Sequence, residues 1–205
     1  MADSDHHAPV RPASARAPLL LTAGFVLFVG VLAALVGAAF ARRHVPTYAP
    51  SLALERPTPS SLTTDTVTID ARDPVTWRYF SFARGVLPSA DTAGWDLAFR
   101  RFQVIVAGAV AADSAGEFEQ LREASLTGYT QTVFGSDTVH PTIDRWYRYS
   151  YITHLLTPGT PIYVVRTAAG RYAKLAFLSY YCPGPAPGCV TFQYTYRPDG
   201  GRLFQ

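Results

Sequence analysis

Two histidines are the side chains in the C-terminal part of this sequence that could do chemistry. His140 stands in the segment DTVHPTID, and His154 follows an aromatic run in the segment YITH. A neutral imidazole can ligate iron when a second group fixes its tautomer. The alternative is that each imidazole hydrogen-bonds to the backbone or to water. The sequence leaves both interpretations open.

Two cysteines, Cys182 and Cys189, stand at the ends of the Pro/Gly-rich segment CPGPAPGC. A short segment of this kind is typical of a hairpin end that a disulfide closes, and such a bond forms in an oxidising compartment. The alternative is a pair of free thiols. No histidine lies near the cysteines at the spacing of metal ligands, so we expect no metal site there.

The sequence lacks several common motifs of catalysis. It has no G-x-S-x-G, P-loop, G-x-G-x-x-G or H-E-x-x-H segment, each of which marks a large class of enzymes. The net charge of +3 is small and the cations are dispersed, which disfavours nucleic acid as a partner. We therefore expect a binding protein that is not an enzyme.

An uncharged, proline-free run extends from Leu19 to Ala41. As a helix at about 1.5 Å per residue, it spans about 34 Å and exceeds the ~30 Å hydrocarbon core of a bilayer. We expect a transmembrane helix over residues 18–42, with the membrane as a partner. The alternative is a signal peptide cleaved after Ala41, although the run is longer than the apolar region of such peptides.

One face of this helix consists of small side chains. Gly30, Ala34, Gly37 and Ala38 recur at helical spacing, and small residues let a second helix approach closely. We expect these four residues to pack against another transmembrane helix. The alternative is that they face lipid.

Composition divides the rest of the chain into three parts. Residues 1–17 are polar and rich in proline and alanine, which predicts a disordered cytoplasmic tail. Residues 43–62 carry four prolines, which predict an extended linker. Residues 63–205 contain many short runs in which apolar and polar side chains alternate, and this pattern predicts strands.

We expect the last part to be an all-β domain, an antiparallel sheet structure with one short helix. The helix is predicted from Ser114 to about Glu123, because this stretch opens with a capping-box pattern. Gly170 is predicted to form a hairpin turn, since glycine supplies the positive φ of a tight reversal. The strands are expected at residues 67–69, 77–82, 95–99, 102–106, 129–134, 146–151, 161–167, 171–181 and 190–196.

Four segments of this domain form a recognisable set: YFSFARG from Tyr79, GWDLAFRRF from Gly94, YVVRTAAGRYAKL from Tyr163 and GCVTFQY from Gly188. In these segments the chain resembles the HmuY family of bacterial haem-binding proteins. The resemblance covers about residues 64–197, and it implies an all-β fold shaped roughly like a right hand. It also implies haem held between two side chains, histidines or methionines, for which His140 and His154 are the candidates.

Two hypotheses about function remain. The first is an accessory, structural subunit that docks on the periplasmic face of a larger membrane complex, such as a photosynthetic or respiratory one. It would use the small helix face and the many tyrosines and arginines of the domain. It needs no cofactor, and its partners are other transmembrane subunits. The second hypothesis, which the resemblance implies, is a tethered haem- or porphyrin-binding protein.

The location follows from the cysteines rather than from charge. Arg11 and Arg16 precede the expected helix, and Arg42 and Arg43 follow it, so the positive-inside rule gives no orientation. The expected disulfide favours the oxidising side for the domain. We expect a single-pass protein of the bacterial inner membrane, with a cytoplasmic N-terminus and a periplasmic C-terminal domain.

Overall fold

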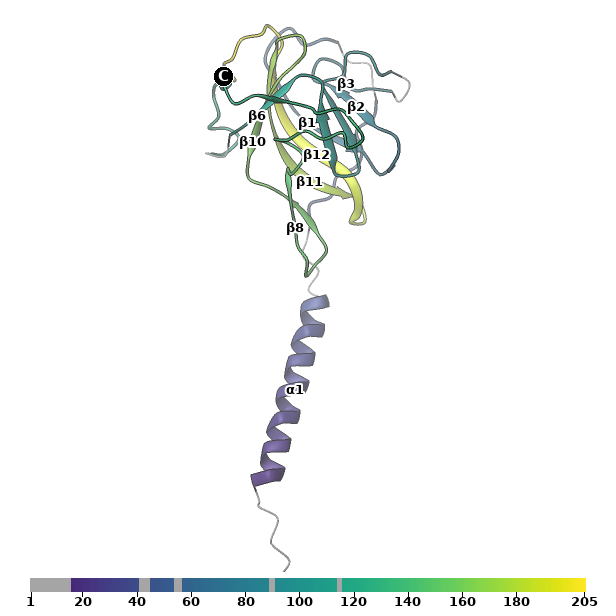
Figure 1. The fold of residues 1–205 in the computed structure, drawn as a ribbon, viewed down its shortest axis with the longest axis vertical. Coiled ribbons are helices and arrows are strands. Elements are labelled where there is room, and N and C mark those ends of the chain that lie inside the picture. The colour runs from purple at the N-terminus through teal and green to yellow at the C-terminus, as the bar shows by residue number, and fades with distance from the viewer. Residues whose placement is uncertain (1–15, 41–44, 54–56, 89–90, 114–115) are drawn as a thin grey trace, which may run out of the picture. The chain divides into compact units, whose positions relative to one another are not determined.

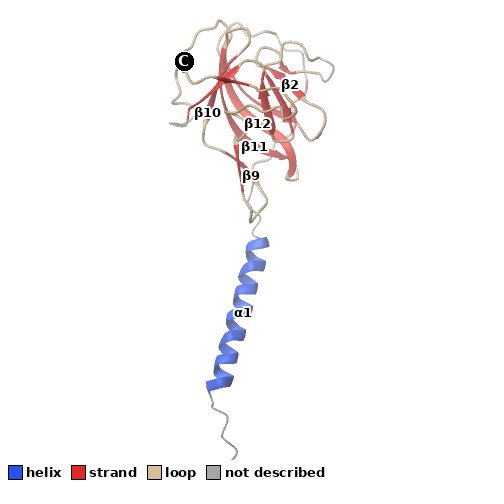
Figure 2. Cartoon of the chain, viewed as in Figure 1, coloured by secondary structure: helices blue, strands red, loops and turns tan. Residues whose placement is uncertain are grey.

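The structure is a computed structural model that describes residues 16–40, 45–53, 57–88, 91–113 and 116–205. The expected tail over residues 1–17 lies outside these ranges except for its last two residues. The chain has two compact units, one that ends at His44 and one that runs from Val45 to Gln205. We call the second unit the head. Figures 1 and 2 show a helix in the first unit, and strands and loops in the head.

The helix α1 runs from Arg16 to Phe40. Its stretch Leu20–Gly37 has a mean hydropathy of 2.5 and no buried residue. By length and composition, α1 is the one helix among the described residues that can cross a membrane. A signal sequence near the N-terminus would meet the same criteria.

The small face of α1 is open in the structure. No described atom lies within 4 Å of the place that a Cβ would take at Gly30 or Gly37. Ala34 is exposed, whereas the side chain of Ala38 lies outside the described set. The packing of this face against a second helix stays a prediction.

Two antiparallel sheets and a separate hairpin make up the described head. The larger sheet has the order β1-β12-β11-β10-β6-β7, and the smaller sheet has the order β3-β2-β4-β5. β8 and β9 form a two-stranded sheet of their own, and Figure 1 shows that this hairpin projects from the rest of the head. The expected all-β antiparallel fold is confirmed. The strands are β1 (Thr63–Asp70), β2 (Arg78–Ser81), β3 (Gly85–Val86), β4 (Leu97–Arg100), β5 (Gln103–Val106), β6 (Ala109–Asp113), β7 (Thr130–Gln131), β8 (Tyr147–Tyr149), β9 (Leu156–Pro158), β10 (Ile162–Arg166), β11 (Tyr172–Cys182) and β12 (Ala186–Arg197).

Aromatic side chains pack the two sheets against each other. Phe80 of β2 and Phe99 of β4 contact Phe192 of β12, with ring centroids 5.3 and 5.5 Å apart. All three rings are fully buried, and the burial of one phenylalanine contributes roughly 1.5–3 kcal/mol. The two sheets therefore share one aromatic core.

The disulfide expected between Cys182 and Cys189 is confirmed, and it closes the end of the β11–β12 hairpin. Next to it, Gly188 has a φ of +113°, and a Cβ there would lie 3.0 Å from the backbone of Arg72. Glycine suits this position, because side chains of other residues rarely adopt such a φ. The close approach lets Ala71 N donate to Gly188 O at 2.8 Å.

The one short helix expected in the head is absent from the described residues. The chain makes a turn there instead, and Gln120 N donates to Glu117 O at 2.9 Å. The buried Lys174 explains the difference, because its Nζ donates to Phe118 O at 2.7 Å and to Leu121 O at 2.9 Å. In an α-helix that ends near Glu123, Phe118 O would accept from the amide four residues later. The Lys174 ammonium takes that acceptor, and it also donates to Leu121 O, which such a helix would leave without a partner.

Residues 45–53, which we call the strap, lie along the strands of the head. Tyr48 N donates to Tyr181 O at 3.0 Å, and Ser51 N donates to Thr68 O at 2.9 Å. In return, Thr68 N donates to Ser51 Oγ at 3.0 Å. Part of the stretch expected to be an extended linker is therefore hydrogen-bonded to β1 and β11.

Candidate functional site

His140 is fully buried, and both of its ring nitrogens have partners. Its Nε2 lies 3.2 Å from Thr130 O, and because a carbonyl only accepts, Nε2 carries the proton and donates. Its Nδ1 accepts from the amides of Thr142 and Ile143 at 3.2 and 3.4 Å. Burial lowers the pKa of His140 and so favours the neutral ring. The structure supports the alternative of a backbone-bonded histidine, with no lone pair left for iron.

His154 lies at the tip of the β8–β9 hairpin and is exposed. Its φ of 54° is in the left-handed region, where histidine is more frequent than most residues. Its Nδ1 lies 2.6 Å from Tyr149 Oη, and either atom can be the donor. When Nδ1–H donates to the hydroxyl, Nε2 presents its lone pair. Among the described residues we find no hydrogen-bond partner of Nε2, so this nitrogen is available to a ligand.

Backbone hydrogen bonds give the tip a defined shape. His154 N donates to Ser150 O at 2.8 Å, and Ser150 N donates to Leu155 O at 2.9 Å. Thr153 N donates to Ser150 Oγ at 3.2 Å. A residue other than glycine keeps a left-handed conformation where its surroundings impose it, as they often do at ligand sites. These hydrogen bonds therefore fix the backbone that carries the imidazole of His154.

The base of the hairpin is anchored in the core. Trp146, directly before β8, stacks on Phe177 with ring centroids 4.3 Å apart. Its Nε1–H donates to Phe102 O at 2.8 Å, and its carbonyl accepts from Gly159 N at 2.7 Å across the hairpin. Buried tryptophans need such a partner for the indole N–H. These contacts hold one end of the hairpin while the other end projects.

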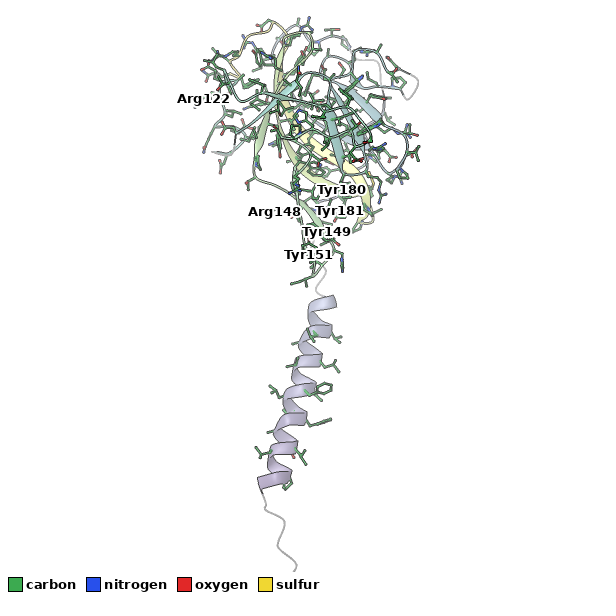
Figure 3. The ribbon with its side chains drawn as sticks, viewed as in Figure 1. Arg122, Arg148, Tyr149, Tyr151, Tyr180 and Tyr181 are labelled. Carbon is green, nitrogen blue, oxygen red and sulfur yellow. A yellow bond between two sulfur atoms is a disulfide. The ribbon has the colours of Figure 1, made fainter. Side chains whose placement is uncertain are left out.

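An aromatic ring, that of Tyr149, lies beside the imidazole of His154. Tyr149 and Tyr151 meet edge to face with centroids 5.2 Å apart, and the Tyr149 ring lies 6.0 Å from that of His154. Figure 3 shows Tyr149 and Tyr151 together at this end of the head. Ile152, the next residue, is exposed. An aromatic ring beside an available nitrogen suits a planar, apolar ligand that carries a metal.

The two candidate histidines do not share a role in the described structure, because His140 is enclosed and His154 is on the surface. Within the described residues there is no group of three or more His, Cys, Asp or Glu side chains that could hold a metal ion. Of the two candidate histidines, His154 is the one with a ring nitrogen available to a ligand. The other histidines and the methionine lie outside the described residues: His6, His7, His44 and Met1.

Tyr149 is the site residue that the sequence did not reveal. It is one of several tyrosines in an aromatic run, and nothing in its type distinguishes it. The nearest signal is the turn between β8 and β9. That turn is a loop of residues 150–155, and strand pairing places Leu156 opposite Tyr149, so pairing alone does not bring the hydroxyl to His154.

Comparisons with known proteins agree with the fold. The family model of the HmuY protein matches residues 119–194. The crystal structure of the apo HmuY analog of Tannerella forsythia has a TM-score of 0.57 at 18% identity, and the match covers 68% of this chain and 98% of that chain. None of the curated proteins matches this chain.

Two further solved structures from Bacteroides share the fold. A Bacteroides vulgatus protein, provisionally described as HmuY-like and heme-binding, has a TM-score of 0.53 at 22% identity, with coverage of 64% of this chain and 90% of its own. A Bacteroides fragilis protein, provisionally described as a lipoprotein, has a TM-score of 0.54 at 19% identity, with coverage of 64% and 88%.

The head therefore has a HmuY-like fold, and the resemblance noted in its sequence is confirmed. At these identities, the solved structures establish the fold alone. The range matched by the family model contains the whole β8–β9 hairpin, including His154 and Tyr149.

Proposed function

We propose that this protein binds haem or a related porphyrin at the tip of the β8–β9 hairpin, on a head that α1 tethers to a membrane. The observation that carries the proposal is the exposed imidazole of His154, whose Nδ1 lies 2.6 Å from Tyr149 Oη. The HmuY-like fold supports it, because a relative with this fold is described as heme-binding.

The residues at the tip fit this ligand. His154 would hold the iron through Nε2, and Tyr149 would accept the Nδ1 proton and so fix the tautomer and the ring orientation. Tyr151 and Ile152 would offer apolar surface to the porphyrin. Bound haem would supply an iron centre whose properties depend on its axial ligand and on its exposure. Our proposal is a binding role, without a catalytic residue.

The comparisons favour this function over that of an accessory subunit. They connect the head with a fold found in a protein described as heme-binding, and they say nothing about a host complex. Docking on a photosynthetic or respiratory complex stays a prediction from the sequence. Native purification followed by mass spectrometry of co-purifying proteins tests it.

Titration of the full chain with haemin in detergent tests the proposed function. We expect a Soret shift that saturates at one haemin per chain. The variant His154→Ala is expected to lose most of this shift. Tyr149→Phe keeps the ring but not the hydroxyl, and we expect it to bind haemin about 10–100-fold more weakly, as when a partner of a metal ligand is lost.

The matched control is His140→Asn, which changes the other candidate histidine. Because the nitrogens of His140 already have protein partners, this variant is expected to keep the Soret shift. A shift that survives in His154→Ala would contradict the assignment of the ligand. The absence of any shift in the parent chain would contradict the function itself.

A further inference from the structure

The tip of the β8–β9 hairpin carries the two most exposed large apolar side chains of the described head. Ile152 is 93% exposed and Tyr151 is 85% exposed. Tyr149, beside them, is 41% exposed. Single exposed apolar residues are ordinary, but three within four positions at a projecting end form a patch. A patch of this kind marks an interaction surface.

Arg148 of β8 lies beside this patch, whereas Arg145 lies at the base of the hairpin, next to Asp144. Arg145 and Arg148 are exposed, and Figure 3 shows Arg148 beside the two tyrosines of the tip. The sequence has no aspartate or glutamate between Arg145 and Arg166. Tyrosine rings, an aliphatic side chain and arginines are the combination that proteins place at a membrane surface. The rings lie among the headgroups, and the cations lie near anionic lipid.

The fold holds this patch away from the core of the head. The hydrogen bonds around Ser150 shape the tip, and Leu156 N donates to Tyr181 Oη at 2.9 Å where the hairpin leaves the larger sheet. Ile152 therefore cannot turn inward without breaking this support. The exposure of Ile152 is therefore a property of the folded head, and only a partner outside the head could bury this side chain.

Tyr181 of β11 forms hydrogen bonds both to the strap and to the β8–β9 hairpin. Tyr181 O accepts from Tyr48 N of the strap at 3.0 Å, and its hydroxyl accepts from Leu156 N of the hairpin at 2.9 Å. Residues 41–44 alone connect α1 with the strap, and a chain of that length spans at most about 18 Å. With α1 in a bilayer, the chain keeps the strap within that reach of lipid.

We infer that the tip of the β8–β9 hairpin docks on a lipid surface that contains anionic lipids. Ile152 would enter the boundary of the acyl chains, with Tyr149 and Tyr151 at the level of the headgroups. Arg148 would pair with a lipid phosphate. This inference rests on the proposed function in one respect: haem is a flat and largely apolar molecule that partitions into membranes, so a docked tip would collect it there.

Fluorescence quenching in nanodiscs tests the contact with lipid. The full chain carries Ile152→Trp in discs of phosphatidylcholine and phosphatidylglycerol whose acyl chains are brominated. The matched control is Leu203→Trp. Leu203 pairs with Glu123, next to Arg122, and Figure 3 shows Arg122 at the opposite end of the head from Tyr151. The three native tryptophans give the same background in both variants.

Brominated lipid is expected to remove most of the fluorescence that Ile152→Trp adds and to leave that of Leu203→Trp unchanged. Replacement of Arg148 by glutamine is expected to reduce the quenching in discs that contain phosphatidylglycerol. An unquenched tryptophan at position 152, or equal quenching at both positions, would overturn the inference. If the quenching is the same with and without Arg148, and with and without phosphatidylglycerol, anionic lipid has no role.

These measurements need no haem, so they separate this inference from the proposed function. Quenching without a Soret shift keeps the docking and rejects haem binding. A Soret shift without quenching keeps haem binding and rejects the docking. When both are present, Arg148→Gln is expected to slow the transfer of haemin to the chain from vesicles that contain phosphatidylglycerol, while the affinity for haemin in detergent is unchanged.

Discussion

The buried imidazole of His140 makes the stability of the head depend on pH. Burial lowers its pKa below the ordinary value of 6.5, so the unfolded chain takes up a proton at a higher pH than the folded chain does. We predict that the free energy of unfolding falls as the pH drops through about 6.5 and continues to fall down to the folded-state pKa. Denaturant unfolding at about pH 7.5 and about pH 5 measures the change.

The control for this prediction is His140→Asn, whose amide oxygen can accept the same backbone N–H groups but does not titrate. The buried carboxyl of Asp96, whose pKa burial raises, acts in the opposite direction at lower pH. The difference between the parent and the variant therefore isolates His140. Equal pH dependence in both chains would show that the imidazole does not titrate as the structure implies.

Two histidines that look alike in the sequence have opposite roles in the structure. Both stand near turn-forming residues, and the sequence offers both as ligands. The difference between them is burial. His140 is buried inside the head and bonds to Thr130 O, whereas His154 lies on the exposed turn after β8. Burial depends on contacts between distant segments, so the residue types could predict the candidates but not the choice between them.

Lys174 links β11 to a segment more than fifty positions earlier. Its ammonium donates to Phe118 O and Leu121 O, and it lies 4.4 Å from the centroid of the Phe118 ring. We predict that Lys174→Met lowers the stability of the head by about 1–3 kcal/mol, because two buried carbonyls lose their donor. Hydrogen exchange of residues 116–124 should accelerate more than that of β11. Denaturant unfolding gives the overall loss.

Arg122→Met is the matched control, since Arg122 lies on the same segment and its side chain is exposed. It also removes one cation, so a general effect of charge would appear in both variants. We expect its stability to stay close to that of the parent. If Lys174→Met unfolds at the same denaturant concentration as this control, the ammonium is not what holds the segment.

The strands that could be predicted are those whose own residues favour them. β11 and β12 are long runs of aromatic and aliphatic residues, and the turn expected at Gly170 is confirmed by its φ of +74°. β6 (AVAAD) has an alanine-rich sequence with weak strand preference, and the sequence did not predict it. Its five residues pair one by one with β10. Pairing with β10, rather than the composition of β6, makes this segment a strand.

At the scale of the whole molecule, we predict that α1 is retained as a membrane anchor. Its 25 residues span about 37 Å as a helix, more than the ~30 Å of a hydrocarbon core. The chain extracted from membranes should have the intact mass of 22.4 kDa, and it should remain in the membrane pellet after alkaline washing. A mature N-terminus at Arg42 would instead identify α1 as a signal peptide.

A variant with leucine at Ala39 and Ala41 serves as the control, because leucine removes the small residues that a signal peptidase requires. We expect the parent and this variant to give the same intact mass. A parent that is shorter than the variant would show that cleavage occurs in the natural sequence. The periplasmic placement of the head depends on the same experiment.

The fold class could be predicted at this scale, because the strand runs and the HmuY-like segments agreed with each other. The projection of the β8–β9 hairpin could not be predicted from the sequence. Its strands resemble the others in composition, yet they pair outside both larger sheets. Where a hairpin leaves a sheet is decided by packing at its base, here by Trp146 on Phe177, and that packing joins segments far apart in the sequence.

The two hydrogen bonds of Tyr181 have a mechanical consequence. Tension on the chain before Val45 would load the strap first, and the strap meets β11 through a parallel bridge between Thr47 and Tyr181. A bridge of one residue pair yields before a ladder of eight pairs such as that of β1 with β12. Such a pull would therefore detach the strap from β11 while the ladder of the larger sheet still holds.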